Sequence, residues 1–311
     1  MDILVSGAIA YDRILYFNGH FKDLFLAEKV HALSVSFDIQ TIDESFGGTG
    51  GNIAYNLHLL GLNPLLFSSA GTDYARYSEW FKKLGISEEH IVLVPDMLTS
   101  QAHIMTDRDN NQITGFHQGA GSYMYDEPIP TTPDSLAVVA PAHSKNMLHF
   151  SKHYQAHGMK YLFDPGQQVP TFSQEDFTAC LEGAWIFVAN DYEMSLSLAK
   201  TGWSEDELKA NVPIVITTLG DRGSIVHYDG TSHTIGIAPA EVVTDPTGAG
   251  DAYRAGLMKG IALGLPVEKA AQLAATVASY AIEKQGTQNH TFNMEEVASR
   301  HHKAFGEKLP L

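Results

Sequence analysis

The chain has 311 residues, with 20 Lys and Arg against 36 Asp and Glu, so its formal net charge is −16 at pH 7. Such acidity argues against a nucleic-acid partner, because contact with a phosphate backbone requires clustered cations. Hydrophobic residues form 44% of the chain and supply a sizeable core, but no apolar run approaches the roughly 18 residues that a membrane span requires. Cys180 is the only cysteine and cannot form an internal disulfide, which fits a reducing compartment. The first residues lack the basic segment followed by an apolar one that a secretory signal needs, so we expect a cytoplasmic protein.

Apolar runs typical of buried strands alternate with helical patterns along most of the chain. The first strand, residues 2–5, ends near Gly7, and a glycine-rich stretch then leads into a helix that Gly61 ends. This alternation indicates βαβ units, so we expect one α/β domain over residues 1–311, with a mainly parallel sheet flanked by helices. Further strands are predicted at 64–67, 146–150, 160–163, 185–189 and 213–218, and further helices at 74–84, from 248 onward and over 266–284.

Two segments, residues 13–45 and 96–120, interrupt the alternation. In the second, β-like stretches at 102–106 and 112–116 are separated by residues that are mostly Asp and Asn. Clusters of that kind favour turns, which predicts a β-hairpin. We expect both segments to form extra strands outside the main sheet and to pack together as a small lid.

Residues 242–256 carry the clearest chemical signal. The N–H groups of Gly248, Ala249 and Gly250 are predicted to hold a phosphoryl group, because a helix start offers unpaired donors and partial positive charge. Asp251 follows in the first turn, where an acidic residue also complements the helix dipole without any catalytic role. Its place beside an anion site favours proton removal during phosphoryl transfer.

Four motifs resemble those of the ribokinase-like (PfkB) carbohydrate kinases. Residues 47–52 resemble the N-terminal glycine motif, 190–193 the Asn-x-x-Glu motif, 218–223 the Thr-x-Gly-x-x-Gly nucleotide loop and 245–251 the C-terminal signature. The resemblance implies a ribokinase-like fold and a kinase that uses ATP, and the sequence contains no P-loop motif. Within the family, the chain is most similar to bacterial adenosine and other nucleoside kinases, on residues 164–167, 251–256 and 286–290.

The resemblance also implies roles around the acceptor hydroxyl. Asp251 would be the general base, and the N–H groups of residues 248–250 would stabilise the transferred phosphoryl group. From the residues alone, the glycines of 47–51 also fit a tight entry into a helix. Asp12, which follows the first strand, equally fits a surface turn. The residues expected to bind the sugar hydroxyls are Asp12, Gly47, Gly48 and Asn52, and those expected to contact the base are Gln112 and Phe116, the latter equally suited to the core.

The same resemblance implies sites for ATP and its metal ions. Asn190 and Glu193 would hold waters around Mg²⁺, although the pair also fits a helix N-cap and its partner three residues later. The residues expected near the ribose and phosphates of ATP are Thr218, Gly220 and Gly223, with Asn289 near the adenine. A monovalent-cation site, for example for K⁺, is expected at Asp245, Thr247 and Gly286.

Three histidines, His149, His153 and His157, have the i, i+4, i+8 spacing that would align zinc ligands on one helix. Residues 146–150 are predicted as a strand, which would turn His149 away from the other two. No carboxylate or cysteine nearby completes the set, so we expect no metal there.

We therefore predict an ATP-dependent kinase that phosphorylates the 5′-hydroxyl of an adenosine-like nucleoside, a reaction of purine salvage. A sugar kinase for ribose or fructose is the first alternative, and a nucleoside-binding homologue without catalysis is the second. The expected partners are small molecules, a nucleoside or a sugar, and the chain is expected to be a monomer or a homodimer.

Overall fold

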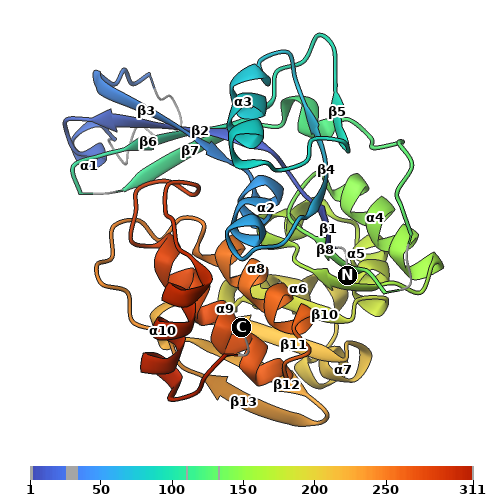
Figure 1. Cartoon of the computed structure of the whole chain (residues 1–311). Coiled ribbons are helices and arrows are strands. Elements are labelled where there is room, and N and C mark those ends of the chain that lie inside the picture. The colour runs from blue at the N-terminus through green and yellow to red at the C-terminus, as the bar shows by residue number, and fades with distance from the viewer. Residues whose placement is uncertain (1–2, 26–33, 110, 132–133, 310–311) are drawn as a thin grey trace.

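The computed structural model describes residues 3–25, 34–109, 111–131 and 134–309, and within these ranges nine strands form a main sheet (Figure 1). Its order is β13-β12-β11-β10-β9-β8-β1-β4-β5, parallel from β5 to β11 and antiparallel beyond. Residues 2, 26–33 and 110 of the predicted strand and lid segments lie outside these ranges. The strands are β1 Ile3–Ser6, β4 Leu65–Ala70, β5 Ile91–Leu93, β8 Leu136–Val139, β9 Lys160–Phe163, β10 Ile186–Asn190, β11 Ile214–Thr218, β12 Ser224–Tyr228 and β13 Thr231–Ile235.

Helices cover both faces of the main sheet (Figure 1). On one face lie α2 Thr49–Leu59, α3 Ala75–Leu84, α8 Ala249–Ala262, α9 Val267–Ala281 and α10 Met294–Phe305. On the other lie α4 Ser144–Ala156, α5 Gln174–Glu182, α6 Asp191–Thr201 and α7 Glu205–Asn211. The short elements are α1 Phe21–Leu24 and the 3₁₀ helices Gly119–Ser122, Gly166–Thr171 and Gly220–Arg222.

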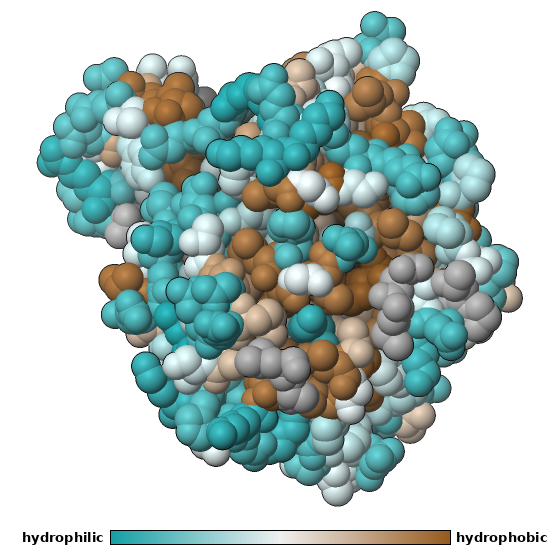
Figure 2. All heavy atoms as spheres, in the orientation of Figure 1, coloured by the Kyte–Doolittle hydropathy of each residue, from teal (hydrophilic) through white to brown (hydrophobic). Residues whose placement is uncertain are grey.

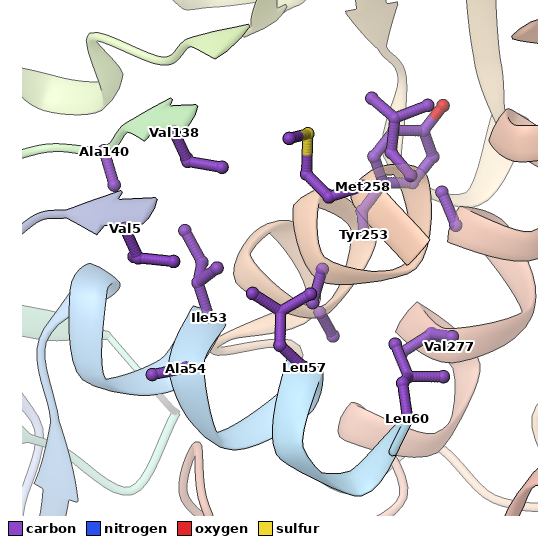
Figure 3. Close-up of a cluster of buried hydrophobic side chains, with 14 of the residues drawn as sticks. Val5, Ile53, Ala54, Leu57, Leu60, Val138, Ala140, Tyr253, Met258 and Val277 are labelled. Atoms are coloured by element: carbon purple, nitrogen blue, oxygen red, sulfur yellow. The ribbon is translucent and has the colours of Figure 1, made fainter. Parts of the chain in front are cut away.

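Successive residues of the central strands pack on opposite faces of the sheet. Ile3 and Val5 of β1 join the cluster under α2, α8 and α9, whereas Leu4 joins the cluster under α4 and α5. Figure 3 shows Val5, Ile53 of α2 and Met258 of α8 within the first cluster. Strands buried on both faces are apolar throughout. The predicted mainly parallel sheet flanked by helices is therefore confirmed.

A second, smaller sheet has the order β3-β2-β6-β7 and projects from the body of the molecule (Figure 1). β2 is antiparallel to β3 and parallel to β6, and β6 pairs antiparallel with β7. The hairpin predicted over residues 102–116 is thus present. Its strands are β2 Ala10–Phe17, β3 Ile39–Gly47, β6 Ser100–Thr106 and β7 Gln112–His117.

Two predicted elements differ from the structure. Residues 146–150 were expected to form a strand but belong to α4, because Met147, Phe150 and Tyr154 are buried at helical spacing against the sheet. The C-terminal region was expected to end in two helices, yet α10 follows them. It begins with a capping box in which the Asn293 and Glu296 side chains accept from each other's backbone N–H groups.

The surface drawn in Figure 2 is hydrophilic around most of its margin, with hydrophobic side chains gathered in the middle. Among the described residues, none of the helices combines the length and the apolar character that a bilayer crossing requires.

Helices α8 and α9 pack with almost no space between their backbones. A Cβ added at Gly256 would lie 2.7 Å from the Ala274 Cα, and one at Gly260 would lie 2.6 Å from the Ala270 Cα. Real Cβ atoms do not come this close, so these two glycines permit the contact. The contact sets the position of α8 against the sheet and hence the position of its first turn.

We expect Gly260→Ala to lower the free energy of unfolding by about 1–2 kcal/mol. Overpacking costs about 1–3 kcal/mol, and the better helix propensity of alanine offsets up to about 1 kcal/mol of this. Urea unfolding measures the change. Gly236→Ala is the control, because a Cβ there meets nothing within 4 Å. Equal stabilities of the two variants would contradict the close contact.

Candidate active site

A cavity of about 730 Å³ lies where the C-terminal ends of the main strands meet the small sheet. Ligands of parallel sheets gather at this edge, and the volume is in the range of small-molecule sites, roughly 300–1,000 Å³. Predicted site residues supply much of its lining: Asp12, Gly48, Asn52, Phe116, Asn190, Glu193, Thr218, Gly220, Thr247, Gly248, Gly250 and Asp251.

The first turn of α8 opens into this cavity. Gly248 caps the helix with φ 80°, a left-handed conformation that favours glycine. The Ala249 N–H donates to the Pro246 carbonyl at 3.2 Å, so this donor, predicted to hold an anion, already has a partner. The N–H groups of Gly248, Gly250 and Asp251 have no acceptor among the described residues. Two of the three donors predicted to hold an anion are therefore free, and the Asp251 N–H is a further free donor beside them; the anion site itself stays a prediction.

Asp251 carries a carboxyl group suited to act as a base near neutral pH. Burial raises its pKa to about 7, while the hydrogen bond from Asn52 and the nearby charge of Arg254 lower it and the charges of Asp164 and Asp12 raise it. A carboxylate with such a pKa can accept a proton from an alcohol and release it again. The free N–H groups of the first turn of α8 therefore lie beside a carboxyl group with a raised pKa.

Asn52 holds the Asp251 carboxylate in place. Its Nδ2 donates to Asp251 Oδ2 at 2.8 Å, while its Oδ1 accepts from Thr287 Oγ1 at 2.8 Å and Gln288 Nε2 at 3.0 Å. Two donors on the amide oxygen fix the orientation of the amide, so that its nitrogen faces Asp251. Asn52 was predicted to bind sugar hydroxyls. It does line the cavity, but in this structure its amide group serves Asp251.

Asp12 lies on β2 and also lines the cavity. Burial raises its pKa to about 6, and the Asp245 charge adds to this effect. Gly47 faces the carboxylate, because a Cβ there would lie 2.2 Å from Asp12 Oδ2. Phe116 lines the cavity with half of its surface exposed, which agrees with a contact residue better than with the core. Gln112 is exposed at the far end of β7 and outside the lining.

On the nucleotide side, Asn190 and Glu193 form a complete capping box at the start of α6. Asn190 Oδ1 accepts from the Glu193 N–H at 2.8 Å, and Glu193 Oε2 accepts from the Asn190 N–H at 2.9 Å. The capping alternative is therefore correct, and both side chains also line the cavity. Burial raises the pKa of Glu193. A carboxylate and an amide oxygen at the cavity wall are donors that Mg²⁺ accepts, directly or through water.

Two residues expected to contact ATP lie outside the lining of the cavity. Asn289 is exposed, and its Nδ2 donates to the Gln285 carbonyl at 2.8 Å. Gly223 packs against β13, since a Cβ there would lie 2.1 Å from the Ile235 oxygen. Thr218 and Gly220 do line the cavity.

Asp245, Thr247 and Gly286 lie together, as expected for one site. The Asp245 carboxylate accepts the Thr247 N–H at 2.9 Å and the Gly286 N–H at 3.0 Å, and so ties the two loops together. Its side-chain oxygens are thus engaged with backbone donors, which leaves a monovalent-cation site there a prediction.

Sequence reasoning missed the ion pair of Arg254 and Asp164, whose Nε and Oδ2 atoms are 2.7 Å apart in the cavity wall. Two signals were available: Arg254 is three residues after Asp251 on a helix, hence on the same face, and Asp164 directly follows β9. Thr287 and Gln288 carried no local signal, because their role depends on contact with α2.

The histidine alternative can be assessed from α4. His149 and His153 lie on this helix and His157 caps its end, so the strand expected at His149 was wrong. Among the described residues, the three imidazoles do not gather closely enough to share a metal; the one group that does is His20, Asp107 and Asp109. The Lys22 ammonium group donates to Asp109 Oδ2 at 3.2 Å, so this carboxylate is already paired with a positive charge.

We expect Asn52→Ala to raise the pKa of Asp251 above its value of about 7, because the variant removes a donor that stabilises the ionised carboxylate. The Asp251 carboxyl would then ionise at higher pH in a ¹³C NMR titration. Asn146→Ala is the matched control, since Asn146 is a buried cavity residue whose amide binds the backbone at Tyr123 and Tyr125 instead. An unchanged or lower Asp251 pKa in Asn52→Ala would contradict the contact.

Comparison with known proteins identifies the family. Residues 3–293 match the pfkB family of carbohydrate kinases. The chain is 36% identical to Burkholderia thailandensis nucleoside kinase, solved in complex with inosine, with TM-score 0.86 over 98% of this chain and 99% of that one. Methanocaldococcus jannaschii nucleoside kinase superposes with TM-score 0.88 at 28% identity, over 97% and 98% of the two chains.

A nucleoside kinase of Methanothermobacter thermautotrophicus is 30% identical over 319 residues, which cover 100% of this chain and 98% of the relative. These likenesses extend over the whole fold, including the small sheet. The chain therefore belongs to the pfkB family of carbohydrate kinases and is a phosphotransferase with an alcohol acceptor.

Proposed function

We propose that this protein is an ATP-dependent nucleoside kinase that phosphorylates the 5′-hydroxyl of a purine nucleoside such as adenosine or inosine. The observation that carries the proposal is the pairing, in one cavity, of the Asp251 carboxylate with the free N–H groups at the start of α8. The Burkholderia thailandensis kinase, solved with inosine and also with ADP and inosine, supports the choice of substrates.

Phosphoryl transfer needs little covalent help from the protein, since its transition state is loose and depends on positioning and charge. The 5′-oxygen forms a bond to the γ-phosphorus of ATP as the bond from that phosphorus to the β,γ-bridging oxygen breaks. The hydroxyl proton goes to the Asp251 carboxylate, and ADP leaves with the electron pair. The N–H groups of Gly250 and Asp251 stabilise charge on the transferred group.

Asp12 is suited to the ribose end of the substrate. Its carboxylate can accept hydrogen bonds from both hydroxyls of a vicinal diol. With a pKa of about 6, Asp12 is mostly ionised at neutral pH. Gly47 and Gly48 allow the ribose to approach the backbone beside it. The 5′-hydroxyl would then face Asp251, which lines the same cavity.

Asn190 and Glu193 fit Mg²⁺ at the nucleotide phosphates, bound through water. The metal, when bound, offsets phosphate charge and orients the γ-phosphoryl group. A monovalent cation beside Asp245, Thr247 and Gly286 remains a weaker proposal, because the Asp245 carboxylate is engaged with backbone N–H groups.

A nucleoside fits the cavity better than a simple sugar. Beyond Asp12, the lining continues over Thr114 and Phe116 of the small sheet, where an exposed aromatic ring can stack on a base. We also propose that this sheet acts as a lid that excludes water during transfer. A role in purine salvage and a cytoplasmic location belong to the same proposal, with the buried free thiol of Cys180 suited to a reducing compartment.

The acceptor is tested with Mg-ATP and a panel of adenosine, inosine, cytidine, ribose and fructose, with products detected by mass. We expect the 5′-monophosphate of a purine nucleoside to form fastest. Product from ribose or fructose but from no nucleoside would favour the sugar-kinase alternative. Tight nucleoside binding without ADP release from any acceptor would favour the non-catalytic one.

We expect Asp251→Asn to lower kcat by about 10²–10⁴-fold, the usual contribution of a general base, while ADP affinity and Tm stay close to the wild type. Asp176→Asn is the matched control, because Asp176 occupies the same third position of helix α5, outside the cavity. Wild-type turnover in folded Asp251→Asn would contradict the assignment of a base, and an equal loss in Asp176→Asn would show that the effect is not specific to Asp251.

A further inference from the structure

The cavity is short of positive charge for a ligand that carries phosphates. Its described lining includes four carboxylates, from Asp12, Asp164, Glu193 and Asp251, and a single Arg or Lys, which is Arg254. Helix donors and Mg²⁺ offset part of the phosphate charge. The phosphate charge that remains needs a cation from the protein, and Arg254 is the one Arg or Lys in the described lining.

Arg254 is buried, with 6% of its surface exposed, and lies three residues after Asp251 on α8. Its Nε is 2.7 Å from Asp164 Oδ2, although the pair does not meet the angles of a hydrogen bond. Its Nη1 packs against Gly250, because a Cβ on that glycine would lie 2.5 Å from Nη1. The guanidinium is therefore held at one side by Asp164 and contacts the anion-binding turn at the other.

The buried Arg254 atom without a hydrogen-bond partner is Nε. The terminal Nη groups form no hydrogen bond with the residues that the structure describes either, but they are open to the cavity. An arginine that served only as a structural ion pair would be expected to direct these donors to the protein, whereas here they are left open to the cavity. Their place beside the free N–H groups of Gly250 and Asp251 gives them an acceptor when a phosphoryl group is present.

We propose that Arg254 is a catalytic residue whose Nη groups bind the phosphoryl group during its transfer, with Asp164 as the positioning residue that holds the guanidinium. The inference rests on the proposed function, and the bonds formed and broken are those given above: the 5′-oxygen bonds to phosphorus, ADP leaves with the electron pair and Asp251 takes the proton. Arg254 adds a full positive charge where the backbone supplies only partial ones.

The test compares Arg254→Gln and Arg254→Lys with wild type, using Mg-ATP and the best nucleoside of the panel. Assays are made well above the pKa of Asp251, so that any effect of Arg254 on the ionisation of the base is removed. We expect kcat of Arg254→Gln to fall on the order of 10²–10³-fold, as for the loss of one strong transition-state donor, with a much smaller change in the KM for the nucleoside. Arg254→Lys should retain part of the rate, since lysine keeps the charge but not the planar fork.

Arg300→Gln is the matched control, because Arg300 is also ion-paired and largely buried, bound to Glu283 at 2.8 Å on α10, outside the cavity. Its turnover should equal that of the wild type. Adding guanidinium to the Arg254→Ala variant should restore part of kcat without raising Tm, which a purely structural role would not allow.

Arg254→Gln leaves the buried Asp164 carboxylate without its partner, and this unpaired charge can prevent folding. The double variant Asp164→Asn, Arg254→Gln removes both charges and avoids that problem. We expect it to fold and to remain slow. Wild-type turnover in folded Arg254→Gln or in the double variant would overturn the role of Arg254 while leaving the kinase proposal intact. A wild-type protein that phosphorylates no nucleoside would reject the proposed function, and the inference with it.

Discussion

The site depends on the meeting of two helix starts that are far apart in the chain. Asn52 in the first turn of α2 and Asp251 in the first turn of α8 are separated by 199 positions, yet their side chains are 2.8 Å apart. Both helices cover the same face of the main sheet, so their N-termini reach the same edge. The start of α2 is also packed closely against the end of β1, since a Cβ on Gly7 would lie 2.8 Å from the Gly50 Cα. Because α9 fixes α8 through two glycine contacts, helix packing sets the position of Asp251.

Charge is distributed in a way that fits an acidic protein handling phosphate. The net charge of −16 gives no general attraction for anions. Instead, the groups that we propose to bind phosphate are confined to the start of α8, where free N–H donors and the Arg254 guanidinium lie within one helical turn. Three carboxyl groups, those of Asp164, Asp251 and Asp12, line the same cavity, and two effects reduce the repulsion between them. Asp164 is paired with Arg254, and burial raises the pKa of Asp251 and Asp12 toward neutrality.

The small sheet contributes part of the cavity wall. Asp12 from β2 and Phe116 from β7 face the same space as Asp251, although neither belongs to the main sheet. A wall built on a separate sheet can move relative to the base without disturbing the core. In the proposed function, this arrangement separates the groups that bind the acceptor from those that act on the phosphoryl group.

The sequence by itself determined the alternation of strands and helices, the hairpin at 102–116 and the helix start at Gly248, because these follow from local periodicity and from residues with special backbone preferences. It also indicated Asp251, since a glycine-rich helix start followed by an acid is a local pattern. Residues 146–150 were misassigned because a short apolar run does not distinguish a strand from one turn of a buried helix.

Only the tertiary structure decided what each side chain contacts. Asn52 holds Asp251 because Thr287 and Gln288, from the other end of the chain, occupy its amide oxygen. The Ala249 N–H donates to the Pro246 carbonyl and is no longer free, and Arg254 is held at the cavity by Asp164, which directly follows β9. Such contacts join segments that no local pattern connects, and they form when the sheet brings its strand ends and helix starts to one edge.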